Sequence, residues 1–558
     1  MKSTTTSIAE RKRIGQHFVV GFHGEAPSKD IRTLIQEFFV GSVILMKRNI
    51  VDAEQTRSLV QQLQQLAHDA GHDQPLLIGI DQENGLVSAF GRPGAGTQFP
   101  GAMALSATGS TELAENVSFA IARELKLVGI NWAYSPVADV NSDPRNPVIG
   151  MISSALVWRW SFDQSREHCN QADALTDPSQ VAAFTVAVAR GLTRGGIAAC
   201  AKHFPGHGDT SVDSHLALPQ INKPRSALDS YELPPFKALI SGGIPSIMTA
   251  HILLPLVAHD PASLSKTFTT DILRTELGHS GVVVTDCLEM EAISNQSQGA
   301  CGVEKGAVSA LQAGADIVMI CHTMAWQIGA LEATYEAVIS GQLTLDETRV
   351  AALKNEFSGT WDNVLFTDPE FSSKWASVKK ESAELSRRSY FLSTALVNGS
   401  GFRPLEVGQP VTLFTPPMDS LNKAVDDADD MLRTQDGKVR NTAGPSFLSL
   451  AQSIEKRAPC DHIVYGENNR CTVPTGSTAV IFVLRNADRY PWQLDVLDRL
   501  AACHPLPFIV LGSCAPYEAR LMSHPYIASF EYTPDALEAA MQVVFGEKHP
   551  QGTVPVAY

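Results

Sequence analysis

The sequence predicts an α/β fold class, a (β/α)8 TIM-type barrel followed by a smaller three-layer α/β sandwich domain, and three observations lead to this prediction. From Ile14 to about Thr323, short apolar runs rich in β-forming residues alternate with amphipathic segments, as in parallel strands joined by helices. The runs in this part number eight, which is what a closed barrel of this type requires. From about Ala395, further apolar runs separated by helical stretches indicate a second sheet. We therefore expect a catalytic barrel over 1–345, a helical linker over 346–394 and the sandwich over 395–558.

The eight apolar runs are predicted strands because each is short, rich in β-branched or aromatic residues and bounded by polar or turn residues. In chain order they span 16–22, 41–46, 75–81, 131–137, 197–203, 246–251, 282–286 and 316–322. Four amphipathic stretches are predicted helices, and most of them end in the glycine that helix C-termini favour. They span 52–70, 111–129, 178–196 and 302–314. In the second domain the predicted strands are 411–416, 462–466, 478–484, 507–513 and 527–532.

Composition and charge restrict the classes of function. The 558 residues are 44% hydrophobic and 18% charged, which is typical of a globular protein. A formal net charge of −15 disfavours nucleic acid or an anionic membrane surface as the main partner, and it leaves a small neutral or cationic ligand open. The N-terminal stretch lacks the apolar core of a signal peptide, and no uncharged apolar run reaches membrane-spanning length.

The spacing of the cysteines indicates the redox compartment of the protein. Nine cysteines are scattered without a C-x-x-C pair or the regular spacing of a zinc or disulfide framework, so we expect them to be reduced. We therefore predict a cytoplasmic protein.

The second domain carries no glycine-rich phosphate motif and is interpreted as a packing or dimerisation domain, so a homodimer is one expectation.

Polar residues follow the predicted strands at one end of the barrel. Because the carboxyl ends of barrel strands meet at one rim, where enzymes of this fold place their active sites, we expect these side chains to form a catalytic site. They are Asp81 after the third strand, Lys202 and His203 at the end of the fifth, His251 at the sixth and Asp286 at the seventh, with His215 on the loop after the fifth.

The stretch AKHFPGHGDTSVDSH, residues 201–215, leaves two chemistries open. One is metal binding, because five of its side chains are of ligand types: His203, His207, Asp209, Asp213 and His215. The familiar H-x-H and H-E-x-x-H spacings are missing, which disfavours a metal-dependent hydrolase. The other is acid/base catalysis, because Asp213 is close enough in sequence to orient the imidazole of His215. With Asp286 as a nucleophile, this is the arrangement of retaining glycoside hydrolysis.

Several long motifs together resemble one family. AKHFPGHGDTSVDSH, SIMTAHILLP, PASLSKTFTTDILRTELGHSGVVVTDCLEMEAI and GIDQENG are similar, in order and spacing, to the barrel of glycoside hydrolase family 3, and specifically to its β-N-acetylglucosaminidase branch. The resemblance spans roughly residues 14–345. It also implies the second domain, because many members carry an α/β sandwich after the barrel, although the match is much weaker there.

The resemblance implies roles for individual residues. Asp286, in VVVTDCLEM, matches the catalytic nucleophile; His215, in DSH, matches the unusual histidine acid/base, and Asp213 the aspartate that polarises it. The sugar-binding positions match Asp81, Lys202 and His203. No metal and no organic cofactor is implied. For His207, Asp209 and His251, structural support of the loops is at least as good an interpretation as substrate contact.

The sequence departs from the family pattern near Asp81. The branch usually reads D-Q-E-G-G-x-V-x-R, whereas this chain reads DQENGLVSA. Asn84 stands where a glycine is expected, and Ala89 where an arginine would contact the sugar. Arg92 is a candidate substitute, although it lies three positions further along the chain.

A larger departure is an unusual insertion at about 151–176. It interrupts the place where the family continues with R-S-F-G, and it puts Trp160 at the position of a second sugar-binding arginine, with Arg159 one position away. Two interpretations stay open. Either the insertion is a genuine loop that reshapes the pocket, or it is non-coding sequence translated through an error in the gene model.

The function predicted first is a retaining, exo-acting β-glycosidase that removes terminal β-linked N-acetylglucosamine from small glycosides. Asp286 would form the glycosyl-enzyme, and the Asp213–His215 dyad would protonate the leaving oxygen and then activate water. Within the same family, a β-glucosidase or an N-acetylglucosaminide phosphorylase stays open, because a neutral imidazole does not repel phosphate. Outside it, the alternatives are a catalytically impaired sugar-binding protein, which the loss of the two arginines would suggest, and the metal-dependent hydrolase.

Overall fold

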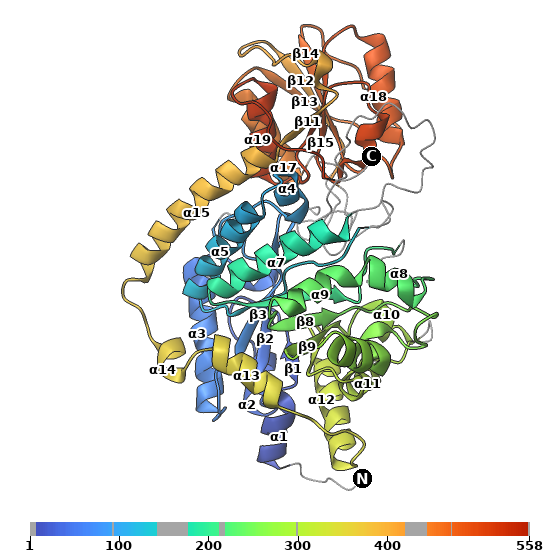
Figure 1. The fold of residues 1–558 in the computed structure, drawn as a ribbon. Helices are drawn as coiled ribbons and strands as arrows, with labels where there is room; N and C mark the ends of the chain where they lie inside the picture. The colour runs from blue at the N-terminus through green and yellow to red at the C-terminus, as the bar shows by residue number, and fades with distance from the viewer. Residues whose placement is uncertain are drawn as a thin grey trace.

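The first domain is a closed barrel, as predicted from the alternating pattern. The structure is a computed structural model and describes residues 7–91, 94–141, 177–210, 218–296, 300–418, 444–469 and 471–555. Eight parallel strands close in the order β1-β10-β9-β8-β7-β6-β3-β2 (Figure 1). They are β1 Phe18–Val20, β2 Ser42–Leu45, β3 Leu77–Ile80, β6 Trp132–Ala133, β7 Ala198–Phe204, β8 Ser246–Thr249, β9 Val282–Cys287 and β10 Ile317–Ile320. Each lies inside or overlaps one of the eight predicted runs.

Helices surround the barrel, and some of them begin after a residue whose side chain satisfies one of their first backbone N–H groups. Asp52 accepts a hydrogen bond from the N–H of Gln55 at 2.8 Å, and Ser110 accepts one from Leu113 at 3.1 Å. The helices of this part are α1 Ile8–Gly15, α2 Lys29–Gln36, α3 Ala53–Asp69, α4 Ala102–Ala107, α5 Thr111–Leu127, α7 Pro178–Arg194, α8 Arg225–Ser230, α9 Leu233–Ser241, α10 Glu291–Ser294, α11 Val303–Ala313 and α12 Met324–Ile339. A π-helical segment, η3 Thr267–Glu276, precedes β9.

The barrel interior sets the direction of the polar residues at the rim. Alternate strand residues fill it with a buried cluster that includes Leu77, Trp132, Cys200, Met248, Val284 and Met319. Because side chains alternate along a strand, residues an even number of positions beyond this set also face the barrel axis. Lys202 on β7 and Asp286 on β9 lie two positions beyond Cys200 and Val284, and Asp81, directly after β3, lies four beyond Leu77. At the other end, α13 Thr348–Phe357 packs on the interior cluster, and its Arg349 pairs at 2.8 Å with Asp316, which precedes β10.

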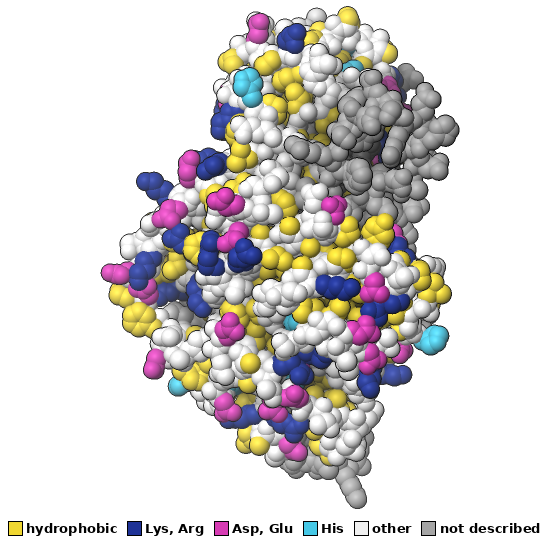
Figure 2. Space-filling model, in the orientation of Figure 1, with side chains coloured by type: hydrophobic (Ala, Val, Ile, Leu, Met, Phe, Trp, Pro, Cys, Tyr) yellow, Lys and Arg dark blue, Asp and Glu magenta, His cyan; other side chains and the backbone are white. Residues whose placement is uncertain are grey.

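A long helix connects the barrel to the second domain. After α13 and α14 Trp361–Leu365, α15 Phe371–Ser393 runs along one side of the molecule (Figure 1). It packs against α4 and α5 of the barrel and against α19 of the second domain. Over the face shown in Figure 2, acidic and basic side chains lie interspersed on the barrel helices.

The second domain is a three-layer α/β sandwich, as predicted. Its sheet has the order β11-β16-β15-β14-β12-β13. The strands are β11 Ala395–Val397, β12 Val411–Thr415, β13 Cys460–Val464, β14 Ala479–Leu484, β15 Phe508–Gly512 and β16 Tyr526–Ala528. All pair in parallel except β11, which runs antiparallel to β16 and was not among the predicted strands.

Two apolar cores cover the two faces of this sheet. Helices α17 Gly444–Glu455 and α19 Pro534–Val544 supply one core. Helix α18 Trp492–Cys503 supplies the other, and the barrel segment α4 adds Met103, Ala104 and Ala107 to it. The two domains therefore share one hydrophobic core.

Within the described ranges, no helix is both long and apolar enough to cross a membrane.

Candidate active site

A lysine buried between two carboxylates lies at the rim between β3 and β7. The ammonium of Lys202 is 2.7 Å from Oδ1 of Asp81 and 2.6 Å from Oε1 of Glu83. The side chains of Lys202 and Glu83 are only 5% and 7% exposed, whereas Asp81 is 37% exposed. Asp81 is thus the member of this group that a ligand in the mouth can reach. Glu83 lies in β4 Gln82–Asn84, which forms a short hairpin with β5 Val87–Ser88 that was not predicted.

The charges of this group depend on one another. Burial opposes the charge of Lys202, but Asp81 and Glu83 outweigh burial and hold its pKa above the usual value, so it stays an ammonium. Burial raises the pKa of Glu83, and Lys202 opposes that rise. A fixed ammonium with an accessible carboxylate can donate to and accept from neighbouring hydroxyl groups of a sugar.

Asp139 holds the loop after β7 in place. Its Oδ2 accepts a hydrogen bond from Nδ1 of His203 at 2.7 Å, and its Oδ1 accepts from the backbone N–H of His207 at 2.7 Å and of His203 at 3.1 Å. Asp139 is fully buried. One carboxylate therefore fixes the ring of His203 and the course of the loop that follows it.

The same contacts set the protonation states. For Asp139, burial favours the neutral acid, but the two histidines and the backbone N–H of His207 outweigh it and hold its pKa below the usual value. For His203, burial opposes the charge, and Asp139 and Asp286 together raise its pKa. For His207, burial dominates and lowers the pKa to about 4. Asp139 and Asp286 thus favour the cationic form of His203, whereas burial favours the neutral form of His207.

Asp286 lies near the end of β9, and its Oδ1 accepts a hydrogen bond from the N–H of Cys287 at 2.7 Å. His251, after β8, is fully buried and braces this turn. Its Nε2 donates to the carbonyl oxygen of Cys287 at 3.0 Å, and its Nδ1 accepts from the hydroxyl of Ser263 at 2.7 Å. These two contacts make His251 a support for the backbone beside Asp286.

The described part of the 201–215 stretch is also tied to the scaffold. Asp209 pairs with Lys223 at 3.0 Å, and Lys223 pairs with the buried carboxylate of Glu232 at 2.8 Å. The hydroxyl of Thr210 lies 2.9 Å from Nδ1 of His207. Here Asp209 and His207 contact protein groups, which agrees with their interpretation as loop support.

Several predicted site residues lie outside the described residues: Asp213, His215, Arg92, Arg159 and Trp160. The structure brings together Asp81, Lys202, His203 and Asp286 at one rim, on strands β3, β7 and β9. Two partners in this site, Glu83 and Asp139, were not assigned a role from the sequence. The available signals were that Glu83 is two positions from Asp81 in DQENG and that Asp139 follows the fourth strand at the same rim.

The structure accounts for one of the departures near Asp81. Asn84 has a φ of 68°, the left-handed conformation that glycine favours and that asparagine tolerates best among the other residues. Its Oδ1 also accepts from Nε2 of Gln82 at 3.1 Å. Asparagine can therefore stand in the position of the family glycine. Ala89 is buried and brings no charge to the mouth.

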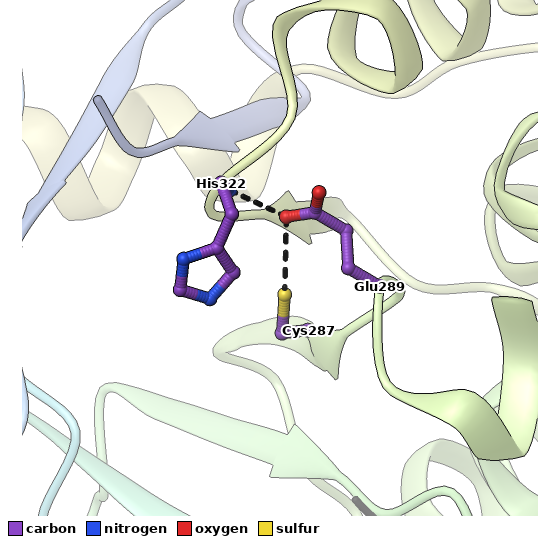
Figure 3. A group of neighbouring side chains, drawn as sticks. All are labelled: Cys287, Glu289 and His322. Carbon is purple, nitrogen blue, oxygen red and sulfur yellow. Dashed lines mark hydrogen bonds between the residues drawn. The ribbon is translucent and has the colours of Figure 1, made fainter. Parts of the chain in front are cut away.

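The described residues also contain a group of side chains of metal-ligand types outside the 201–215 stretch. Cys287, Glu289 and His322 place one ligand atom each within 4.8 Å of one another (Figure 3).

The barrel with its charged, partly buried rim places the protein in the class of (β/α)8-barrel enzymes. The family described as glycosyl hydrolase family 3 N terminal domain matches residues 10–155 and 166–354, and the chain belongs to this family. The gap in that match falls inside the unusual insertion predicted at about 151–176.

Individual relatives agree with this assignment. A β-hexosaminidase A of Pseudoalteromonas piscicida is 34% identical over 320 residues, which are 52% of this chain and 50% of that protein. A β-hexosaminidase of Chromobacterium violaceum is 31% identical over 368 residues, which are 65% of this chain and 93% of that protein. This chain thus matches about half the length of the first relative and nearly all of the second.

A solved structure extends the similarity to both domains. A glycoside hydrolase family 3 β-N-acetylglucosaminidase from Paenibacillus sp. str. FPU-7 is 32% identical, with a TM-score of 0.80, and the match covers 99% of each chain.

Proposed function

We propose that this protein is a retaining β-glycosidase that releases terminal β-linked N-acetylglucosamine from small glycosides. The observation that carries the proposal is the placement of Asp286 on β9, across β8 from Lys202 and His203 on β7, in a member of glycosyl hydrolase family 3. The relatives named β-hexosaminidase and β-N-acetylglucosaminidase supply the sugar class.

In the proposed reaction Asp286 attacks the anomeric carbon and forms a covalent ester, and the bond to the leaving oxygen breaks. His215, oriented by Asp213, gives its proton to that oxygen and then takes one from the water that cleaves the ester. Lys202, Asp81 and His203 bind the sugar hydroxyls.

The test is hydrolysis of p-nitrophenyl β-N-acetylglucosaminide and of the matching β-glucoside by the full chain. We expect the first to be the better substrate, and we expect Asp286→Asn to lower kcat/KM by at least about 10⁴-fold, because the amide is not a nucleophile. The matched control is Asp271→Asn, an exposed aspartate in η3, which should be as active as the native chain.

Two further readouts define the reaction. Proton NMR of the first-formed sugar should show the β anomer, and an initial α anomer would contradict the retaining mechanism. Repeating the assay with inorganic phosphate separates hydrolysis from phosphorolysis, because only phosphorolysis gives a sugar 1-phosphate. A folded native chain that turns over neither substrate would contradict the proposed function.

A further inference from the structure

Three side chains of metal-ligand types converge beside Asp286. Cys287 is the last residue of β9, Glu289 lies in the turn that follows, and His322 lies just after β10. Their ligand atoms are within 4.8 Å of one another, and the Cys287 Sγ is 3.8 Å from Oε2 of Glu289. Figure 3 shows the thiol pointing toward the carboxylate, with the imidazole ring beside both.

The spacing is near that of a zinc site. Bonds of about 2.3 Å to sulfur and about 2.0–2.2 Å to nitrogen and oxygen place tetrahedral ligands about 3.3–3.8 Å apart. Contraction by about 1 Å therefore suffices, which side-chain rotations of Cys287 and His322 can supply. A thiolate and an imidazole select a thiophilic or borderline cation over Mg²⁺ or Ca²⁺. Three protein ligands leave one position open.

The carboxylate of this group is already fixed by the backbone. Glu289 accepts hydrogen bonds from the N–H of His322 at 2.5 Å and of Thr323 at 2.8 Å, at the start of α12. The carboxylate of Glu289 therefore needs little reorientation when an ion binds. A second sulfur is near in the chain, because the buried Cys321 directly precedes His322.

Arg48 opposes occupancy of this group. Its Nη1 lies 3.1 Å from Nδ1 of His322, to which it donates, and its Nη2 donates to the carbonyl oxygen of Cys321 at 2.8 Å. A neutral imidazole that accepts at Nδ1 has its lone pair on that nitrogen, so an ion that binds there must displace the hydrogen bond from Arg48 and compete with the guanidinium charge. The site is thus built for reversible rather than permanent binding.

We propose that Cys287, Glu289 and His322 bind a thiophilic divalent cation such as Zn²⁺ and that its binding inhibits the enzyme. Binding releases the thiol proton of Cys287 to solvent as the metal–sulfur bond forms. Inhibition follows because the N–H of Cys287 donates to Asp286. A shift of Cys287 changes this hydrogen bond, and the adjacent positive charge makes the carboxylate of Asp286 a weaker nucleophile. The inhibition rests on the proposed function, whereas the binding does not.

Binding is tested with Co²⁺ and the full chain after treatment with a chelator. We expect a thiolate-to-cobalt absorption band in the near ultraviolet and an apparent Kd that rises at least about tenfold in Cys287→Ser. The matched control is Cys503→Ser, an exposed cysteine at the end of α18, which should leave the titration unchanged. An unchanged band with an unchanged apparent Kd in Cys287→Ser, or no band in the native chain, would overturn the proposal.

Inhibition is tested separately with Zn²⁺ in the p-nitrophenyl assay. We expect Zn²⁺ to lower the rate, a chelator to restore it, and Cys287→Ser to need at least about tenfold more Zn²⁺ for the same loss. In Arg48→Met we expect tighter Co²⁺ binding, because the competing guanidinium is gone. Cobalt binding without inhibition by Zn²⁺ would overturn the inhibitory role. An inactive native chain that still gives the cobalt band would contradict the proposed function and leave the metal site standing.

Discussion

The barrel mouth and the second domain both bury carboxylates, but they surround them with different partners. In the mouth, Asp139 contacts two histidines, which hold its pKa below the usual value in spite of burial. At the junction of the domains, Glu531 accepts from the hydroxyls of Tyr390 and Thr533, each at 2.7 Å, and from the N–H of Gly101 at 2.9 Å. These donors are neutral, and burial raises the pKa of Glu531 to about 7.

Glu518 in the second domain follows the same rule as Glu531. It accepts from the hydroxyl of Tyr526 at 2.8 Å, and burial raises its pKa to about 8. The comparison of Asp139 with Glu531 and Glu518 shows that charged partners can hold down the pKa of a buried carboxylate, whereas Glu83, whose pKa is raised in spite of Lys202, shows that burial can still outweigh such a partner. At Glu531 and Glu518 the hydrogen-bond donors are neutral, and burial favours the protonated acid.

Among the variants that test this comparison, the largest effect is expected from removing the ammonium of Lys202 in the mouth. Lys202→Met leaves Asp81 and Glu83 without their shared ammonium, and breaking a buried ion pair in this way costs about 3–5 kcal/mol. We expect a fall of at least about 10³-fold in kcat/KM and a lower denaturant midpoint. The control is the double variant Lys202→Met with Glu83→Gln, which should recover much of the stability. A double variant that is less stable than Lys202→Met would break the comparison.

A smaller effect is expected for Asp139→Asn. The amide keeps the shape of the side chain but removes the charge that stabilises the cationic ring of His203. We expect kcat/KM to fall about 100-fold and the pKa of His203, followed by NMR, to drop. Asp271→Asn again serves as the matched control. An unchanged pKa of His203 would show that Asp139 does not set the charge of the mouth.

The smallest effect at neutral pH is expected for Glu531→Gln. The folded protein keeps the carboxyl proton of Glu531 up to about pH 7, whereas the unfolded chain releases it near the ordinary pKa of a glutamate. The free energy of unfolding of the native chain therefore falls as the pH rises between these two pKa values. The glutamine variant lacks this loss, so it should match the native chain near pH 5 and exceed it by up to about 3 kcal/mol near pH 8. Urea unfolding at both values measures the difference. Equal pH dependence in the two chains would contradict a neutral Glu531.

Much of the fold could be predicted because its periodicity is strong. The eight barrel strands are buried apolar runs, and their order around the barrel follows from the right-handed βαβ rule. The hairpin β4–β5 was missed because its seven residues, from Gln82 to Ser88, are mostly polar and carry no apolar alternation. β11 was missed because its three residues directly follow the long helix α15.

The site was predicted in part, for a physical reason. Residues that end a strand, such as Asp81, Lys202 and Asp286, share a rim, so the fold class alone brings them together. The partners that set their charge cannot be read in this way, because contacts such as Glu83–Lys202 and Asp139–His203 join distant parts of the chain. Cys287, Glu289 and His322 escaped notice because their ligand spacing arises from two neighbouring strands and not from a local motif.

The contribution of α4 to the second core bears on how this architecture can be rearranged. Met103, Ala104 and Ala107 complete a core whose other members come from residues 395–554. During synthesis, the sandwich can complete its core only by packing against α4, which is made long before it. The second domain is therefore not a self-contained module. Transplanting it onto another barrel would require carrying α4, or an equivalent apolar helix, with it.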